Sequence, residues 1–235
     1  KSVLQLYAAE LMIGSFDDSG RRVFKGGNAI IRAEICAVLV RVMAYVDKHL
    51  ILFAGYRIPV DYTLRMNQRD NAGFSDKNGR IYYDDGGAGT VRYGIDVSAY
   101  QGNINWAAVA ADGIDFAIVR CGFRGYGAGG LNEDPWFRKN VTEARANGLD
   151  VGVYFFSQAL TKEEAREEAE YTLELIKGYD ITFPVVFDWE IVNNAGTRTR
   201  YYAKKDVADS MEVFCDTVAA AGYTPLTYYN PSLAY

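Results

Sequence analysis

Residues 183–190 read FPVVFDWE, a short apolar run that ends in two carboxylates, Asp188 and Glu190. The run carries valine and phenylalanine without polar alternation, which is typical of a strand buried on both faces of a parallel sheet. Side chains alternate along a strand, so positions 188 and 190 point the same way. We therefore predict two acids crowded on one face, each of which raises the proton affinity of the other.

Two interpretations of this acid pair compete, a solvated strand end that faces lysines and a catalytic pair. Barrel enzymes hold their catalytic groups at the C-terminal ends of parallel strands, which favours the second. Paired carboxylates suit the cleavage of a glycosidic bond. The single histidine, His49, is far from the pair in the sequence, which disfavours a Ser/His/Asp triad and a histidine-based zinc site. We expect carboxylate chemistry with no metal and no cofactor.

The chain from residue 91 onward alternates between strand and helix patterns. Strands are expected at 93–98, 116–122, 151–156, 183–190 and 224–229, and helices at 106–111, 135–146, 161–177 and 205–221. Thr161 and Glu164 form a capping box, and the Glu-rich helix that they open is interpreted as a solvated outer face. Five parallel strands with right-handed crossovers predict an α/β fold, either an incomplete (β/α)₈ barrel or an open doubly wound sheet. A complete barrel usually has roughly 250 residues, so we expect this chain to lack the last strands.

Several motifs, taken together and in order, resemble the family-25 glycoside hydrolases, which are lysozymes of the muramidase type. They are GIDVSAYQG at 94–102 with INW at 104–106, FAIVRCG at 116–122, DPWF at 134–137 with Asn140, the strand at 148–156 and PVVFDWE at 184–190. The resemblance spans residues 91–235 and implies the irregular (β/α) barrel of the family-25 lysozyme type. It also implies hydrolysis of the β-1,4 bond between N-acetylmuramic acid and N-acetylglucosamine in peptidoglycan.

The resemblance assigns roles to three acids. Glu190 matches the family's general acid and must hold a proton near neutral pH, while Asp188 would stay ionised. If the substrate's N-acetyl carbonyl is the nucleophile, Asp188 orients the acetamido group and Asp96 balances the developing positive charge. A direct inverting route is the alternative. Without the resemblance, Asp96 reads as a turn or cap residue before Ser98.

Three further residues are candidates for substrate binding. Tyr154, Tyr229 and Gln101 lie at or just beyond predicted strand ends, where they could hydrogen-bond to sugars or stack on them. The alternative for the tyrosines is a place in the core, because aromatic residues in strands are more often buried.

Residues 1–50 differ in kind from the rest. Helical spacing at 3–13, a polar Gly-rich turn at 16–27 and an apolar-striped helix at 29–46 predict a helix-loop-helix. The pattern resembles one S-layer homology repeat, in which Thr usually precedes Arg-Ala-Glu, whereas this chain has Ile31 there. Such repeats work in threes on secondary cell-wall polymers, so this segment is a candidate for polymer binding, with a packing element as the alternative.

The predicted domains are the helical repeat at 1–50, a linker with some strand at 51–90, and a family-25 catalytic domain at 91–235 that is incomplete at its C-terminus. The first residues show no charged, apolar and cleavage-site series of a signal peptide. We therefore expect further chain upstream of Lys1.

Composition favours a polysaccharide as partner. A net charge of −5 without a basic stripe or a Gly-rich phosphate loop argues against nucleic acid. No apolar run reaches the roughly 18 residues of a membrane span.

Cys36, Cys121 and Cys215 each fall in an apolar pattern and are expected as small buried hydrophobes without disulfides. The resemblance implies peptidoglycan glycan strands as the partner and an extracellular or cell-wall location.

Two other functions remain open. A non-catalytic cell-wall polysaccharide-binding protein could keep the sugar cleft on a truncated lysozyme-like barrel, since further cleft residues of the family would follow Tyr235. A chitinase-like barrel also carries an acid at the end of its fourth strand. Its motif has alternating aspartates where this chain has Pro184 and Val186, which places that function behind the others.

Overall fold

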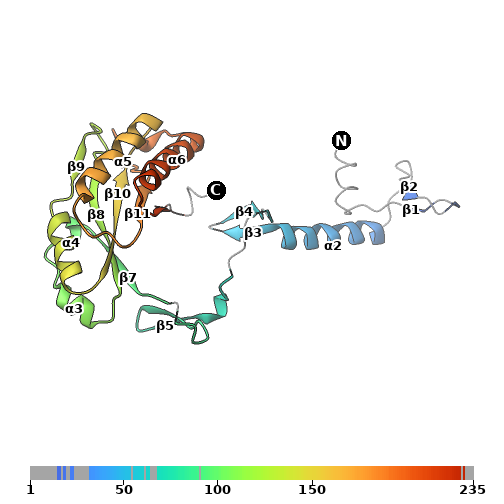
Figure 1. Ribbon diagram of the computed structural model, residues 1–235. Helices are drawn as coiled ribbons and strands as arrows, with labels where there is room; N and C mark the ends of the chain where they lie inside the picture. The colour runs from blue at the N-terminus through green and yellow to red at the C-terminus, as the bar shows by residue number, and fades with distance from the viewer. Residues whose placement is uncertain are drawn as a thin grey trace. The chain divides into compact units, whose positions relative to one another are not determined.

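The computed structural model of the protein describes residues 15–16, 18–19, 22–23, 32–53, 55–60, 62–63, 68–89, 91–228 and 230 (Figure 1). The chain divides into two compact units, Lys1–Gln68 with Tyr235, and Arg69–Ala234. The acid pair at 188 and 190 belongs to the second unit, which therefore contains the candidate site.

The second unit is built on a sheet whose parallel strands follow one another in chain order. The order across the sheet is β12-β11-β10-β8-β7, and β9 pairs antiparallel with β8. The bounds are β7 Gly94–Val97, β8 Phe116–Arg124, β9 Leu131–Glu133, β10 Asp150–Ser157, β11 Val185–Trp189 and β12 Pro225–Tyr228. The five predicted parallel strands are confirmed, each to within two residues at its ends.

The strand order decides between the two sheet types that the sequence left open. Each parallel strand pairs with the next parallel strand along the chain, so the order does not reverse. A doubly wound sheet contains a point at which the order reverses. The parallel sheet is therefore singly wound, as in a (β/α) barrel, and the α/β prediction is confirmed at this level.

Four of the described helices connect the strands, and two of them, α3 and α5, begin at a capping side chain. They are α3 Trp106–Ala111, α4 Phe137–Ala146, α5 Lys162–Ile176 and α6 Lys204–Ala220. At α5 the Thr161 hydroxyl oxygen accepts a hydrogen bond from the Glu164 N–H at 3.2 Å, as the capping box predicts. The Glu164 carboxylate accepts from the Leu160 N–H at 2.8 Å instead of from Thr161, so the reciprocal bond is displaced by one residue.

The core lies between one face of the sheet and the helices. Phe187 of β11 packs against Phe214 of α6 with ring centroids 5.0 Å apart. Every second residue of the strands takes this face, as side-chain alternation requires. The buried apolar residues that β8, β10 and β11 place on this face are Ala117, Val119, Cys121, Val151, Val153, Phe155, Val185, Phe187 and Trp189. The intervening residues, among them the acid of β11, face the other side of the sheet.

The cysteines agree in part with the prediction. Cys121 is a free, fully buried thiol that donates a hydrogen bond to the Tyr154 carbonyl oxygen at 3.2 Å. Burial raises the pKa of Cys121 to about 12. Cys215 is also free but only half-buried, and the side chain of Cys36 lies outside the described part of the structure.

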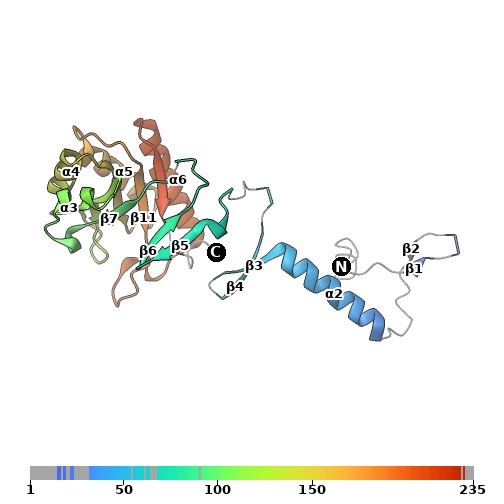
Figure 2. The ribbon, with the colours of Figure 1, turned by 90° about the horizontal axis from the view of Figure 1, so that it is seen from below.

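A hairpin of β5 Phe74–Lys77 and β6 Arg80–Tyr83 precedes the sheet within the second unit (Figure 2). Its turn residues Asn78 and Gly79 have φ values of 59° and 80°, which the tight turn requires. Arg80 forms an ion pair with Asp112 at 3.1 Å and so ties the hairpin to the end of α3. The expected linker at 51–90 contains this hairpin, and its residues from Arg69 onward join the compact unit of the sheet.

The first unit contains one long helix and two short strand pairs. These are α2 Arg32–His49, β1 Ser15–Phe16 with β2 Arg22–Val23, and β3 Leu50–Phe53 with β4 Tyr56–Pro59. The helix predicted at 29–46 is confirmed, with both ends three residues later. The predicted turn at 16–27 overlaps the β1–β2 pair, which begins at Ser15, and the helix predicted at 3–13 lies outside the described residues. None of the described helices is long and apolar enough to cross a membrane.

Truncation of Phe214 tests the core. We expect Phe214→Ala to lower the free energy of unfolding of the second unit by about 3–5 kcal/mol, because it leaves a cavity beside Phe187. Phe74→Ala, at a half-exposed ring of the hairpin, is the control and should lower it by less than about 1.5 kcal/mol. All three tryptophans lie in the second unit, so denaturant unfolding followed by tryptophan fluorescence reports on that unit. Equal losses in the two variants would contradict this core.

Candidate active site

The predicted acid pair lies at the C-terminal end of β11, on the sheet face turned away from the core. Asp188 is the residue before the last of β11, and Glu190 follows the strand directly. The strand register places Asp188 beside Phe156 of β10 and Tyr228 of β12. Because Phe187 is buried against the helices, alternation points the Asp188 side chain to the opposite face.

Asp188 occupies a desolvated position near two other acids. Its carboxylate oxygen Oδ1 is buried and receives no hydrogen bond from the described residues. Burial, followed by the charges of Glu190 and Asp96, raises the pKa of Asp188 to about 7, while the Arg120 charge acts in the opposite direction. The structure therefore brings together the three predicted catalytic acids, although they come from β7 and from the end of β11.

The protonation of Asp188 differs from the expectation that it stays ionised. With a pKa of about 7, Asp188 gains and loses its proton across neutral pH. The reason is burial: the side chain belongs to a strand in the middle of the sheet, with β10 and β12 on either side. A sequence pattern gives no measure of how much water reaches such a position.

Arg120 of β8 supplies a positive charge at this face. Its Nε donates a hydrogen bond to Asp134 Oδ2 at 2.7 Å, and Asp134 is fully buried. The same carboxylate oxygen accepts a hydrogen bond from the Ala99 N–H at 3.0 Å, which links Arg120 to the turn that follows β7. Sequence analysis missed both residues. Their signal is a lone arginine in the apolar run FAIVRCG and an aspartate in the motif DPWF.

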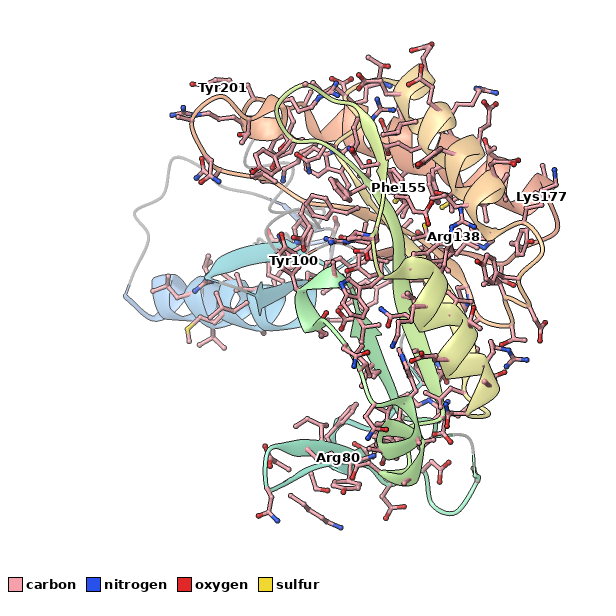
Figure 3. The ribbon with its side chains drawn as sticks, turned by 90° about the vertical axis from the view of Figure 1, so that its left-hand side faces the viewer. Arg80, Tyr100, Arg138, Phe155, Lys177 and Tyr201 are labelled. Carbon is pink, nitrogen blue, oxygen red and sulfur yellow. The ribbon has the colours of Figure 1, made fainter. Side chains whose placement is uncertain are left out.

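The Arg120 guanidinium also lies over two aromatic rings. Its central carbon is 5.1 Å from the ring centroid of Tyr100 and 5.3 Å from that of Phe123. Tyr100 is 88% exposed, so one face of this stack is open to a ligand. In Figure 3, Tyr100 and Arg80 lie toward opposite ends of the strands. Tyr100 follows the C-terminal end of β7, and Asp188 and Glu190 lie at the C-terminal end of β11.

Tyr154 lies within β10, three residues before its end, and its electrostatic partners include Asp188 and Asp96. Burial raises the pKa of Tyr154 to about 12, the Arg120 charge and a hydrogen bond with the Ser98 side chain lower it, and the charges of Asp188 and Asp96 raise it further. The phenol therefore stays protonated at every physiological pH and can act as a hydrogen-bond donor.

Gln101 shapes the turn that follows β7. Its Oε1 accepts hydrogen bonds from the Ser98 N–H at 2.8 Å and from the Ser98 hydroxyl at 3.3 Å. These bonds form a capping box around the short 3-10 turn η2, Ala99–Gln101. The structure thus gives Gln101 a role in holding the loop of Tyr100, next to the predicted role in sugar binding.

Tyr229 lies outside the described residues, but its neighbour Tyr228 is described. Tyr228 ends β12 in register with Asp188, and its side chain is about half exposed. The charge of Glu190 is the largest of the causes that raise the pKa of Tyr228. Sequence reasoning did not single out Tyr228, because the end of β12 could not be fixed to one residue.

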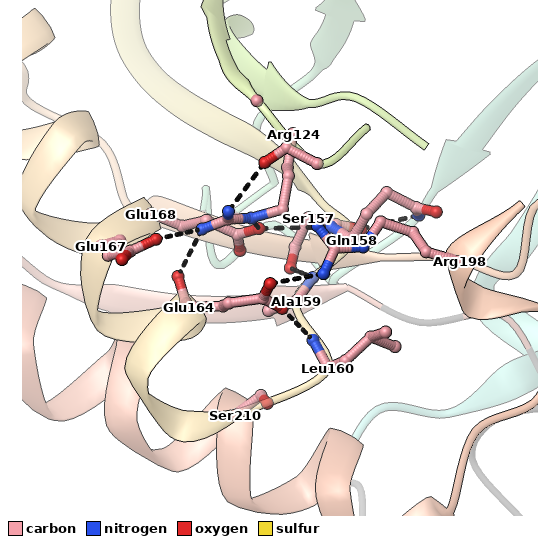
Figure 4. A network of polar contacts seen from close by, with 12 residues as sticks. Arg124, Ser157, Gln158, Ala159, Leu160, Glu164, Glu167, Glu168, Arg198 and Ser210 are labelled. Atoms are coloured by element: carbon pink, nitrogen blue, oxygen red, sulfur yellow. Dashed lines mark hydrogen bonds and ion pairs between the residues drawn. The ribbon is translucent and has the colours of Figure 1, made fainter. Parts of the chain in front are cut away.

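A buried polar network connects β8, α5 and the turn after β10 (Figure 4), and Gln158 links it to the main chain that follows β11. Arg124 of β8 and Glu168 of α5 form an ion pair at 2.7 Å, and both are almost fully buried. Arg124 also donates to the carbonyl oxygens of Gly129 and Glu164, each at 2.9 Å. Burial raises the pKa of Glu168 to about 7, against the lowering effect of Arg124. The interpretation of this Glu-rich helix as a solvated face is therefore wrong at position 168.

The arrangement offers carboxyl groups that can donate or accept a proton, beside a tyrosine donor and a fixed positive charge. In the part of the chain that the structure describes, no group of three His, Cys, Asp or Glu residues could hold a metal ion. Carboxylates at the C-terminal end of a parallel sheet are typical of glycoside hydrolases. The fold and the site therefore fit the class of enzymes that cleave glycosidic bonds with a carboxylate pair.

The family follows from the sequence comparison. The model of the family described as Glycosyl hydrolases family 25 matches residues 95–234, which is more than half of the chain. The protein belongs to this family. The match includes Asp96, Asp188 and Glu190, and it confirms the family resemblance of the motifs.

The matches with individual relatives each cover less than half of the relative's length. Lysozyme M1 of Streptomyces globisporus is 38% identical over 66 residues, which is 28% of this chain and 20% of that protein. The structure of the modular autolysin LytC from Streptococcus pneumoniae matches 79% of this chain and 45% of that chain, with 25% identity and a TM-score of 0.54. LytC in complex with a synthetic peptidoglycan ligand matches with a TM-score of 0.52 at 24% identity. The chain spans less than half the length of these relatives.

The raised pKa of Asp188 predicts how stability depends on pH. Its folded-state pKa of about 7 lies above its ordinary value of 3.8, so the folded chain binds the proton more tightly. The stability that this proton binding contributes is present at low pH and is lost as the pH rises through about 7. Between pH 5 and pH 8 we expect the wild-type chain to lose about 2 kcal/mol more stability than Asp188→Asn, which cannot ionise.

Denaturant unfolding followed by tryptophan fluorescence at both pH values measures this difference. Asp216→Asn is the control, because Asp216 lies on an exposed position of α6 and should leave the pH dependence as it is in the wild type. Parallel pH profiles for the wild type and Asp188→Asn would show that Asp188 is solvated in the folded chain.

Proposed function

We propose that this protein is a peptidoglycan hydrolase, an N-acetylmuramidase that cleaves the β-1,4 bond between N-acetylmuramic acid and N-acetylglucosamine. The observation that carries the proposal is the position of Asp188 and Glu190 at the end of β11, close to Asp96, in a chain of family 25. The similarity to a lysozyme, and to an autolysin whose structure includes a peptidoglycan ligand, supports the same substrate.

Glu190 is the proposed general acid. Its carboxyl proton passes to the glycosidic oxygen as the bond between C1 and that oxygen breaks, and the leaving sugar departs as an alcohol. The positive charge that develops at C1 and the ring oxygen is stabilised by the nearby carboxylates of Asp188 and Asp96. Glu190 therefore acts in its protonated form, and Asp188 in its ionised form.

Two routes complete the reaction. In the substrate-assisted route, the N-acetyl carbonyl oxygen attacks C1 while Asp188 accepts a hydrogen bond from the acetamido N–H, and water then opens the ring that has formed. In the inverting route, water attacks C1 directly. The buried Asp188 oxygen that receives no hydrogen bond from the described residues favours the first route, because such an oxygen is an acceptor suited to an N–H donor of the substrate.

Tyr154 and Gln101 are proposed to bind the sugar beside the acids, and Tyr229 is proposed for the same role from its place in the sequence directly after Tyr228. Tyr154 fits as a donor, since its phenol keeps its proton. The exposed ring of Tyr100 extends the same face and can stack on a sugar ring.

The remaining proposals concern the whole chain. Residues 91–235 would form the catalytic domain, with the barrel of the family-25 lysozymes, and 51–90 its connection to an S-layer-homology-like segment at 1–50. That segment has a secondary cell-wall polymer as its candidate ligand and packing as its alternative role. A peptidoglycan substrate places the protein outside the cell or at the cell wall.

Release of reducing ends from purified peptidoglycan tests the function. We expect Glu190→Gln to abolish release, because glutamine has nearly the same shape but an amide that is too weak an acid to protonate the leaving oxygen. Asp188→Asn should lower the rate at least about a hundredfold if Asp188 stabilises the acetamido group. Mass spectrometry of the new end sugar should show N-acetylmuramic acid.

The controls separate loss of chemistry from loss of fold or of binding. Asp216→Asn on the exposed side of α6 should keep full activity, and Glu190→Gln should still bind glycan fragments. Turnover by Glu190→Gln at the wild-type rate would remove the acid assignment. Glycan binding by the wild-type chain with no release would instead support a non-catalytic polysaccharide-binding protein.

A further inference from the structure

Gln158, labelled in Figure 4, lies in the turn that follows β10 and is fully buried. Both ends of its side-chain amide form hydrogen bonds. Its Nε2 donates to the carbonyl oxygen of Glu190 at 2.7 Å and to that of Ser157 at 2.8 Å. Its Oε1 accepts a hydrogen bond from the Thr199 hydroxyl at 2.9 Å. A buried amide with three short hydrogen bonds has one conformation, because each lost bond would leave a buried polar group without a partner.

Glu190 needs this support because the sheet ends before it. The last residue pair of the β10–β11 ladder is Ser157 with Trp189. The Trp189 indole N–H donates to the Ala159 carbonyl oxygen at 2.8 Å, which fixes the strand end from its buried face. The next contact is the hydrogen bond from Gln158 to the Glu190 carbonyl oxygen. Through it, the turn after β10 holds the main chain at Glu190, one residue beyond the last ladder pair.

Thr199 extends the support to the loop that follows Glu190. Its hydroxyl group donates to Gln158 and accepts a hydrogen bond from the Val192 N–H at 3.1 Å. Thr199 is fully buried. The main chain from Glu190 to Val192 is thus held at both ends by one pair of side chains.

Gln158 is itself fixed from the helix side. Its main-chain N–H donates to Glu168 Oε1 at 3.3 Å, the same oxygen that pairs with Arg124 Nε at 2.7 Å. Arg124 and Glu168 are almost fully buried and belong to β8 and α5. A residue that positions a reacting group must have its own conformation locked by neighbours of this kind.

From this geometry we infer that Gln158 is a positioning residue for Glu190. Its amide fixes the main chain at position 190, and with it the direction in which the Glu190 carboxyl group points, and Thr199 holds the amide in place. The inference rests on the proposed role of Glu190 as general acid. A displacement of about 1 Å at a proton donor lowers the rate roughly a hundredfold, so the effect falls on kcat more than on KM.

Kinetics of four variants of the full chain test the inference. Gln158→Met keeps the side-chain length but removes the amide, and we expect kcat to fall roughly 10- to 100-fold with KM changed less than about twofold. Thr199→Val should lower kcat in the same direction, and Thr199→Ser, which keeps the hydroxyl, should restore it. Thr172→Val is the matched control, because it removes a buried hydroxyl that donates to the Glu168 carbonyl oxygen within α5 at 2.8 Å, and its kcat should stay at the wild-type value.

Hydrogen–deuterium exchange gives a readout that does not depend on activity. Gln158→Met should speed exchange in a peptide covering 190–196 at least about tenfold, and Thr172→Val should not. If the wild-type chain releases no reducing ends but exchange responds in this way, the proposed function fails while the positioning role of Gln158 stands. Unchanged exchange in Gln158→Met, or an unchanged kcat in an active enzyme, overturns the positioning role.

Discussion

The register between β10 and β11 is the constraint on which the site depends. Val185, Phe187 and Trp189 take the buried face, where they pack against the helices. A slip of one residue would turn these side chains to the open face and bring Asp188 into the core. Exposure of each large apolar side chain costs about 2 kcal/mol, and a buried unpaired carboxylate costs more. The apolar residues of β11 therefore determine where its acid points.

Two acids of the second unit, the buried Glu168 and the partly buried Asp188, show the difference between a structural and a functional carboxylate. Burial raises the pKa of both Glu168 and Asp188 to about 7. Glu168 faces Arg124 at 2.7 Å and is part of the framework behind the strand end. Each of the two carboxylates keeps one buried oxygen that receives no hydrogen bond from the described residues. The difference lies in the arginines, because Arg120, the cation that lowers the pKa of Asp188, is paired with Asp134. The second arrangement leaves a carboxylate available to a substrate.

Much of the fold could be predicted because alternating strands and helices leave a local pattern. The run at 183–190 contains both the buried face of β11 and its acids within eight residues, so the sequence is sufficient to identify them. Residues whose role depends on distant partners left weaker signals. Gln158 is an ordinary polar residue after a strand until Thr199 and Glu190 fold onto it. Glu168 looks like its solvated neighbours, because helical periodicity alone does not show that Arg124 lies opposite.

The thiol of Cys121 has a consequence for how the folded chain can be observed. It is enclosed between the sheet and α5 and bonded to the carbonyl oxygen of Tyr154, so an alkylating reagent cannot reach it in the native state. With a pKa of about 12 it also carries almost no thiolate. Alkylation of Cys121 therefore requires β8 and β10 to separate from α5. The rate of this alkylation reports how often the centre of the sheet opens. Loop motion and fraying at the strand ends leave that rate unchanged.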